Sequence, residues 1–146
     1  MDYAKLAVQM MASMWKLRKA IPQRHINESM QGEAFVLQCI ERRGYEMLPG
    51  EISVEMDVSS ARIAAALNSL EGKGLVTRQI DAKDRRKIVV RATQAGMDQA
   101  RRHREALVAD VEKMLALLGE HDAQEYVRIV GRLAELAPKR GRSPQK

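Results

Sequence analysis

Apolar side chains recur at three- and four-residue steps along most of this chain, which is the spacing of helices that turn one face toward a core. Leu6, Met10, Met14 and Leu17 show this spacing near the start of the chain. Each such stretch ends near a proline or glycine, or begins at a residue that favours an N-cap. The pattern predicts six helices, at about residues 6–21, 30–43, 49–56, 59–72, 93–118 and 123–136.

Between the fourth and fifth predicted helices the pattern changes to that of extended chain. Gly72 and Gly74 end the fourth helix, and residues 75–80 and 87–90 are expected to be strands, the second being β-branched throughout after its lysine. Residues 81–86 have the composition of a turn with cations at its tip. A helix followed by two strands and a basic turn predicts a winged helix-turn-helix, so the expected fold class is mainly α with a small β-hairpin wing.

The fourth predicted helix has two different faces. Four apolar residues at helical spacing form a stripe that faces the core, and the opposite side is left free. A short helix with a free face can enter the major groove of DNA. The core-facing residues are Ile63, Ala66, Leu67 and Leu70, and the outward residues are Ala61, Ala65 and Asn68.

The positive charge of the chain is concentrated on the predicted wing. Residues 72–91 contain seven Lys or Arg against two Asp, hence +5, and the whole chain carries +6. A sequence pI of about 9.7 fits a polyanionic partner. Basic composition alone is a weak argument, because many small basic proteins simply keep their charges in solvent. The concentration of charge on one turn is what favours DNA.

Several motifs of this region resemble the signature of the multiple-antibiotic-resistance repressor (MarR) family of bacterial transcription regulators. The motifs are LEGKGLV at residues 70–76, Asp81, the run Asp84-Arg85-Arg86, and the segment from Thr93 to Gly96. Length and pattern are similar over about residues 3–137. The resemblance implies a homodimer whose two wings and two recognition helices bind a pseudopalindromic operator.

The resemblance also assigns roles on the wing and shows two departures. Arg86 is the wing-tip residue that it places in the minor groove, and Asp84 is the carboxylate that orients the tip. A narrow A·T-rich minor groove attracts a guanidinium because it concentrates negative potential. The alternative is a solvated turn with local ion pairs, each worth under about 1 kcal/mol. Ala92 stands where leucine is usual, and the positions of Ala61 and Ala65 are commonly polar.

The expected DNA contacts come from the recognition helix and the wing. Cations and serine hydroxyls are expected to bind phosphates, and the first half of the recognition helix is expected to read bases. The two outward alanines could touch thymine methyl groups. The candidates are Ser59, Ser60, Ala61, Arg62, Ala65, Asn68, Lys73, Lys83, Asp84, Arg85, Arg86 and Lys87.

The first, fifth and sixth helices carry more apolar surface than a winged helix of about 60 residues can bury. We expect residues 1–22 and 93–137 to form dimerisation helices that interdigitate with those of a second copy, burying on the order of 2,000 Å². Within one domain of 146 residues, the winged helix-turn-helix is then residues 30–92. Residues 138–146 carry four cations and no acid and are expected to form a basic, disordered tail.

A small-molecule effector is a further implication of the resemblance. Similar proteins often bind phenolic or other amphipathic compounds in a cleft between the dimerisation helices and the winged domain, which changes the separation of the recognition helices. Methionines adapt to irregular ligands, although a methionine stripe at helical spacing is more often plain core. The candidate effector residues are Met11, Met14, Trp15, His25, Phe35 and Cys39.

Other classes of site are disfavoured. The one cysteine, Cys39, excludes an internal disulfide, and its place on an apolar stripe predicts a buried, inert thiol more than a redox switch. The three histidines are too far apart in sequence to predict a zinc site. No Gly-rich phosphate loop or nucleophile–base motif is present, so neither an enzyme nor a cofactor is expected.

No uncharged stretch approaches the roughly 20 residues of a membrane span, and no secretory peptide is expected, so a cytoplasmic protein is predicted. The predicted function is a dimeric, sequence-specific DNA-binding regulator, acting as a repressor that a small molecule releases. The alternative is a winged-helix protein-interaction module without sequence-specific DNA binding.

Overall fold

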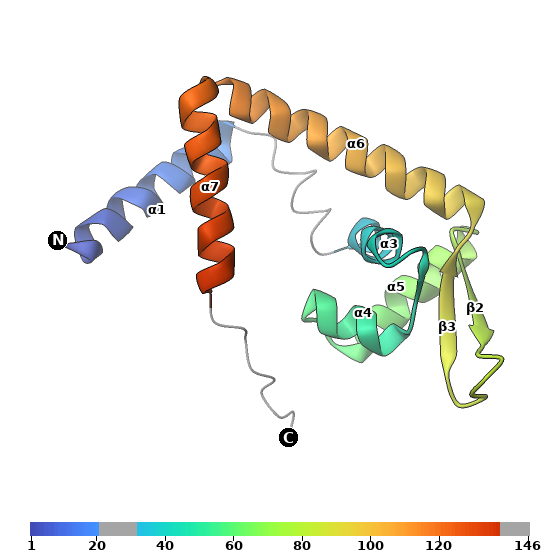
Figure 1. Cartoon of the computed structure of the whole chain (residues 1–146). Helices are drawn as coiled ribbons and strands as arrows, with labels where there is room; N and C mark the ends of the chain where they lie inside the picture. The colour runs from blue at the N-terminus through green and yellow to red at the C-terminus, as the bar shows by residue number, and fades with distance from the viewer. Residues whose placement is uncertain (21–31, 138–146) are drawn as a thin grey trace. The chain divides into compact units, whose positions relative to one another are not determined.

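The structure, a computed structural model, describes residues 1–20 and 32–137 (Figure 1). This part of the chain contains six helices, as the sequence predicts, and a three-stranded antiparallel sheet. It divides into two compact units, residues 1–107 and residues 108 onward. The elements are α1 (Tyr3–Ala20), α3 (Glu33–Arg42), β1 (Glu46–Met47), α4 (Pro49–Met56), α5 (Ser60–Gly72), β2 (Val76–Ile80), β3 (Ile88–Ala92), α6 (Gln94–Ala116) and α7 (Glu120–Leu136).

Several sequence predictions lie wholly or partly outside the described residues. They are the end of the first helix and of the first dimerisation segment at residues 21–22, the start of the second helix at Met30, the candidate effector residue His25, and the basic tail at residues 138–146.

The first unit contains the winged helix, in which α3, α4 and α5 pack with the sheet around one apolar core. Ile40 of α3, Ile52 of α4, Leu70 of α5 and Val90 of β3 are completely buried. These side chains come from four elements that are short on their own, so the core forms only when the elements pack together.

The two faces predicted for the recognition helix are confirmed in α5. Ile63 and Leu67 are buried against α3 and α4, whereas Ala61, Ala65 and Asn68 are exposed. Burial of the apolar stripe therefore fixes which side of α5 is left free for a partner.

Side-chain caps set the ends of the helix-turn-helix as the sequence predicts. Ser59 is the N-cap of α5, and its Oγ accepts a hydrogen bond from Arg62 N at 3.3 Å. Pro49 is the first residue of α4, where its missing N–H leaves no bond unmade. Asp57 ends α4 in the left-handed conformation, with φ of 53°, and thereby turns the chain toward α5.

The sheet has one strand more than the sequence predicts. Its order is β1-β3-β2, and the wing hairpin pairs Val76 with Ala92 and Ile80 with Ile88. On the other side of β3, Met47 of β1 pairs with Val90. β1 has two residues, too few to show the alternation that identifies a strand, so only the tertiary pairing reveals it.

The Thr93–Gly96 motif joins the start of α6 to the turn that follows α5. Thr93 Oγ1 donates to Gly74 O at 2.6 Å and accepts from Gly96 N at 3.1 Å, while Thr93 N donates to Leu75 O at 3.0 Å. Gly96 lies so close to the residue before β2 that an added Cβ would be 2.0 Å from Leu75 O. Thr93 is therefore the predicted N-cap, and Gly96 permits the close approach.

An ion pair between a buried carboxylate and a half-exposed arginine also joins α6 to the winged helix. The Glu41 side chain on α3 is only 7% exposed, and its Oε1 lies 3.3 Å from Arg104 Nη1 on α6. Because a buried carboxylate without a partner is strongly unfavourable, this contact holds the first half of α6 against α3.

The second unit ends in α7, which begins at Glu120, three residues before the expected start. Gly119 precedes it with a positive φ of 76°, so the break between α6 and α7 needs a residue without a Cβ. α7 has no buried residue.

Within the described residues, no helix combines the length and apolar content required to cross a membrane.

Candidate nucleic-acid interface

The free side of α5 presents small and polar side chains. Ser60, Ala61, Ala65 and Asn68 are all exposed, and Ser59 is exposed while it caps the helix. The backbone amides of the first turn point toward the N-terminus and carry partial positive charge. This end of α5 can therefore approach a phosphate, and the free side can approach base edges.

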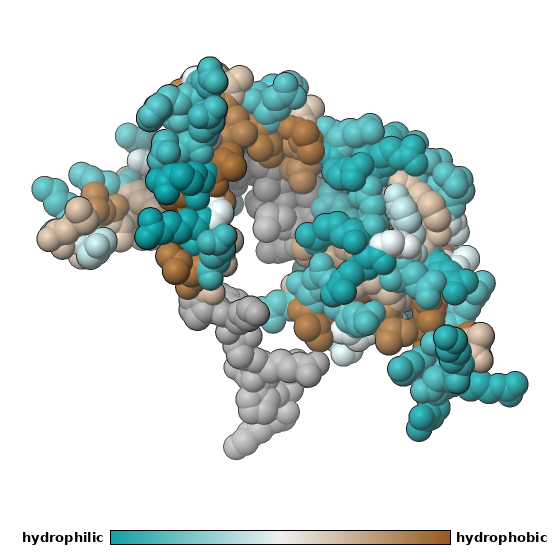
Figure 2. Space-filling view, in the orientation of Figure 1, coloured by the Kyte–Doolittle hydropathy of each residue, from teal (hydrophilic) through white to brown (hydrophobic). Residues whose placement is uncertain are grey.

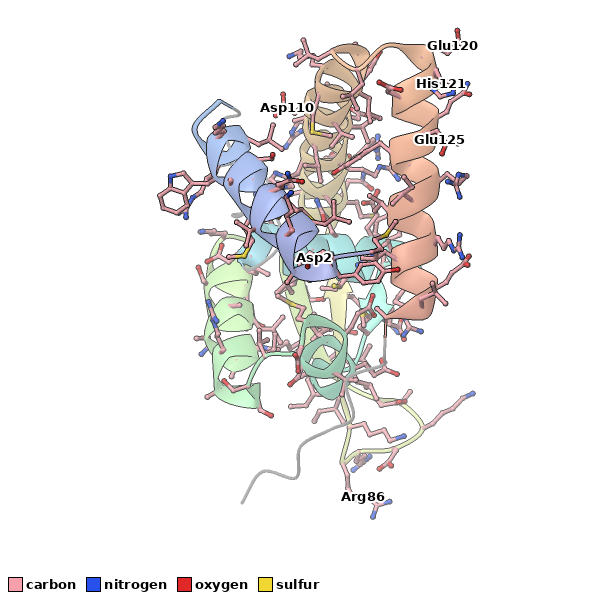
Figure 3. All side chains as sticks on the ribbon, turned by 90° about the vertical axis from the view of Figure 1, so that its left-hand side faces the viewer. Asp2, Arg86, Asp110, Glu120, His121 and Glu125 are labelled. Atoms are coloured by element: carbon pink, nitrogen blue, oxygen red, sulfur yellow. The ribbon has the colours of Figure 1, made fainter. Side chains whose placement is uncertain are left out.

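The wing is a β2–β3 hairpin whose tip carries four exposed cations, Lys83, Arg85, Arg86 and Lys87. Figure 2 shows the tip as a continuous hydrophilic surface at the lower right, and Figure 3 shows Arg86 at its far end. Asp81 N donates to Lys87 O at 2.9 Å and closes the turn. The cations thus project from a hydrogen-bonded turn rather than folding back onto the core.

Asp84 organises this turn around Arg86. Its Oδ1 accepts from Arg86 N at 3.0 Å and from Arg86 Nε at 3.2 Å, and its carbonyl accepts from Lys87 N at 2.9 Å. The backbone amide of Arg86, followed by its guanidinium, lowers the pKa of the Asp84 carboxyl. The Arg86 side chain nevertheless stays 90% exposed. Both Nη groups of Arg86 therefore remain available to an external acceptor.

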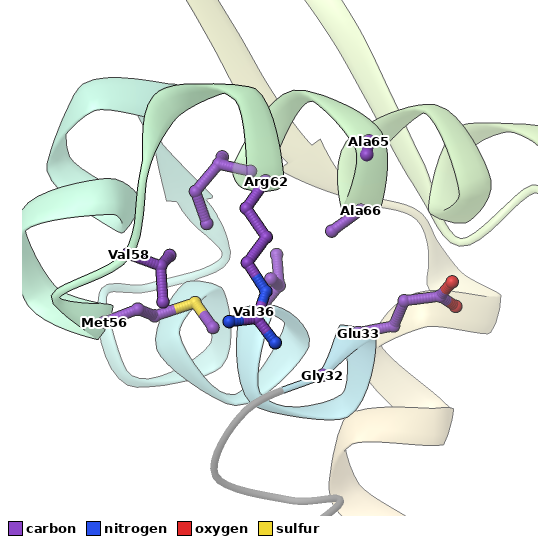
Figure 4. Close-up of a pocket in the computed structure, with 9 residues that line it drawn as sticks. Gly32, Glu33, Val36, Met56, Val58, Arg62, Ala65 and Ala66 are labelled. Atoms are coloured by element: carbon purple, nitrogen blue, oxygen red, sulfur yellow. The ribbon is translucent and has the colours of Figure 1, made fainter.

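Arg62 lies to one side of the free face of α5. Its side chain borders a hollow of about 280 Å³ between the start of α3 and α5, and Figure 4 shows it extending across Met56 and Val58 toward Val36. The alkyl stem covers apolar residues while the guanidinium remains accessible. Arg62 is thus placed for a backbone contact more than for the centre of a groove.

Lys73 is held by an ion pair that the sequence does not reveal. Its Nζ lies 2.6 Å from Glu33 Oε2 on α3, a residue 40 positions earlier in the chain. This hydrogen bond, followed by one from Ser69, lowers the pKa of the Glu33 carboxyl. To bind a phosphate, Lys73 therefore has to break its ion pair with Glu33 or contact the phosphate and Glu33 at the same time.

Arg78 is absent from the predicted contacts, although it lies between the wing and the recognition helix. From β2, its Nε donates to Glu71 Oε2 at 2.7 Å and its Nη2 donates to Asn68 Oδ1 at 2.7 Å. Sequence reasoning counts Arg78 only as part of the charge of the wing. The separations of seven and ten residues belong to no single element, so no local pattern could have identified this bridge.

The comparisons with known proteins agree with this geometry. Residues 30–87 match the model of the MarR family, a span that contains α3, α4, α5 and the wing as far as Lys87. Over this span the chain matches the MarR family. The match and the fold support a DNA-binding transcriptional regulator rather than an enzyme. No curated protein is significantly similar to it in sequence.

Three solved structures illustrate the likeness in fold. FabT from Streptococcus pneumoniae, in complex with DNA, has a TM-score of 0.70 and 21% identity over 92% of this chain and 96% of its own. AbsC from Streptomyces coelicolor, a MarR family transcriptional regulator, has a TM-score of 0.68 and 18% identity, over 92% of this chain and 94% of its own. The organohalide-sensing regulator RdhR-CbdbA1625, bound to 2,4-dichlorophenol, has a TM-score of 0.67 and 15% identity, over 97% of this chain and 90% of its own. At these identities the likeness establishes the fold.

Of the residues predicted for an effector site, five lie in the described part of the chain, and none of them lines either of two hollows beside α5. Met11, Met14 and Trp15 are exposed on α1, Cys39 is completely buried on α3, and Phe35 is partly buried beside it. Neither the hollow beside Arg62 nor the second hollow, between α4, α5 and the wing, is lined by any of them. The effector site remains a prediction.

Cys39 has the surroundings of an inert thiol. Its side chain is buried in the winged-helix core, and desolvation raises the pKa of the thiol. Arg42 Nη2 lies 3.8 Å from the sulfur and opposes this effect only in part. Among the described residues, no group of three His, Cys, Asp or Glu is arranged to hold a metal ion.

Proposed function

We propose that this chain is a homodimeric, sequence-specific repressor that binds a pseudopalindromic operator and is released by a small amphipathic molecule. The observation that carries the proposal is the pairing of a free recognition-helix face with a cationic, outward-directed wing tip. These are the two surfaces with which a winged helix can follow a major groove and the neighbouring minor groove.

Affinity is expected to come mainly from the wing and from the start of α5. Lys83, Arg85 and Lys87 neutralise phosphates, and the Ser59 and Ser60 region donates hydrogen bonds to the backbone. Arg86 enters the minor groove, where its two Nη groups face acceptor atoms and negative potential. The DNA-bound state of FabT, a protein of the same fold, supports this mode.

Homodimer formation is supported by apolar side chains that the single chain leaves uncovered. On α7, Ile129, Val130, Leu133 and Leu136 are 50 to 71% exposed although they recur at helical spacing. On α1, the methionines and Trp15 are exposed as well. An apolar stripe of this length in water is unfavourable, and a second copy of the same helices would bury it.

Effector release is supported by the dimer geometry that operator binding requires. Two recognition helices must be about 34 Å apart to enter successive major grooves, so a ligand that changes their separation lowers affinity. RdhR-CbdbA1625, which has this fold, holds a chlorinated phenol. We propose a ligand of the same amphipathic class for this chain.

One experiment tests these elements together. DNA selected from a random pool by the purified chain is expected to yield a pseudopalindrome, and the complex should dissociate steeply with salt. Sedimentation should give a dimer that Leu133→Asp converts to a monomer with weaker operator binding. Binding without any sequence preference would overturn the proposal and favour a protein-interaction module. Phenolic compounds can then be screened for release of the selected duplex.

A further inference from the structure

Arg78 reaches from the wing to the free face of α5 and holds two side chains that lie one helical turn apart. It donates one hydrogen bond to Glu71 and one to Asn68, each at 2.7 Å. A guanidinium has donors only, in a rigid planar fork. The atom of Asn68 that faces Arg78 is therefore the amide oxygen, and the bridge fixes the orientation of the Asn68 amide.

This orientation leaves the Asn68 amide nitrogen directed away from Arg78. Asn68 is exposed on the same stripe as Ala61 and Ala65. In the part of the chain that the structure describes, no side chain or carbonyl accepts a hydrogen bond from Asn68 Nδ2. The free face of α5 consequently offers a hydrogen-bond donor at Asn68, one turn beyond the methyl group of Ala65.

We propose that Arg78 is a positioning residue for base reading, which makes Asn68 a donor toward guanine in the major groove. This inference rests on the proposed function. Asparagine reads adenine by accepting from N6 through its oxygen while donating to N7. Arg78 takes one of the two lone pairs of that oxygen and holds the oxygen toward β2. Guanine offers two adjacent acceptors, O6 and N7, and requires only the donor that Asn68 presents.

The same bridge also neutralises Glu71, so a purely electrostatic role has to be separated from positioning. The Glu71 carboxylate would otherwise lie unpaired beside the DNA-facing side of α5 and repel phosphates. The loss of a charge weakens binding to all sequences alike, whereas the loss of amide orientation changes the preference at one base pair. The two roles therefore predict different results for the same substitutions.

Four variants distinguish positioning of the Asn68 amide from neutralisation of the Glu71 charge. Arg78→Lys keeps the positive charge but cannot hold both side chains, Arg78→Ala removes both functions, and Asn68→Ala removes the donor. The double variant Asn68→Ala/Arg78→Ala measures their coupling. Arg91→Ala is a control of the same chemistry, because Arg91 Nε lies 2.7 Å from Glu46 Oε2 in a more exposed pair on β3 and β1 that holds no residue of α5.

The readout is the base preference at each operator position, obtained from selected sequences and confirmed with single-base duplexes. We expect a guanine preference at one pair of each half-site, reduced roughly three- to tenfold by Asn68→Ala, Arg78→Ala and Arg78→Lys alike. The double variant should lose no more than either single alanine variant. Arg91→Ala should keep the preference, and all variants should retain the circular dichroism spectrum of the wild type.

Three results would overturn the inference. They are an unchanged base preference in both Arg78 variants, an additive loss in the double variant, and an adenine preference that Asn68→Ala removes. A uniform loss of affinity with a smaller salt slope would assign Arg78 to charge neutralisation instead. A wild type that selects no sequence overturns the proposed function and this inference together, so the two failures are distinguishable.

Discussion

Gly96→Ala is expected to destabilise the winged helix, although alanine is the better helix former. Gly96 lies in the first turn of α6, where an ideal Cβ would be 2.0 Å from Leu75 O and 3.0 Å from Leu75 C. Carbon and carbonyl oxygen normally approach no closer than about 3.3 Å. The obstacle is backbone, so α6 itself must move away from Leu75 by more than about 1 Å.

The loss in the free energy of unfolding can be estimated from the contacts that this movement disturbs. Overpacking against rigid surroundings costs about 1–3 kcal/mol. The hydrogen bonds from Thr93 N to Leu75 O and from Gly96 N to Thr93 Oγ1 also lengthen, each worth about 1 kcal/mol. The better helix propensity of alanine returns at most about 1 kcal/mol. A net loss of about 2–4 kcal/mol remains, or roughly 5–15 °C in Tm.

Thermal melting followed by circular dichroism, at one fixed protein concentration, measures this loss. Gly72→Ala is the matched control, because Gly72 ends α5 and an added Cβ there meets nothing within 4 Å. We expect Gly72→Ala to melt within about 2 °C of the wild type. Equal melting temperatures for both variants would refute the close approach of α6 to Leu75.

Three further outcomes follow from the site. Arg86→Ala should weaken operator binding at least about tenfold in a gel shift, because it removes the guanidinium expected to enter the minor groove. The melting temperature should stay unchanged. Undiminished binding would show that the wing tip is not part of the DNA interface. Glu33 has a lowered pKa in the folded state, so its pair with Lys73 contributes stability above pH about 4.5 that is lost as pH falls through the folded pKa. Acid unfolding of Glu33→Gln should show this contribution missing, at under about 1 kcal/mol. Cys39 should react with a thiol reagent only after denaturation; rapid labelling of the native protein would contradict its burial.

The helices and the faces of α5 are predictable from the sequence because they depend on local spacing. Ser59 caps α5 through a bond to a residue three positions away, and the apolar stripe that begins at Ile63 repeats with the helical period. The wing tip is predictable for a similar reason, since Asp84 and Arg86 interact within one turn. Such features need no knowledge of the rest of the fold.

The features that sequence reasoning missed all join distant segments. β1 is identified only by its pairing with β3, in which Glu46 lies opposite Arg91. The Lys73–Glu33 pair also joins separate elements, as does the Arg78 bridge. A charged residue on an isolated segment looks like solvated surface, and its partner becomes visible only when the segments are packed. The candidate site could therefore be located from the sequence, but its internal hydrogen bonds could not be assigned.

The composition of the free face of α5 limits how much base reading this helix can perform. Ala61 and Ala65 can distinguish only the thymine methyl group, and Asn68 presents one donor. A few contacts of this kind supply a small part of the discrimination that specific DNA-binding proteins show over nonspecific sites. The remainder must come from the wing, because a guanidinium such as that of Arg86 responds to minor-groove width and hence to sequence that no side chain contacts directly. We therefore expect the operator of this chain to depend as much on an A·T-rich, narrow minor groove beneath the wing as on the bases beneath α5.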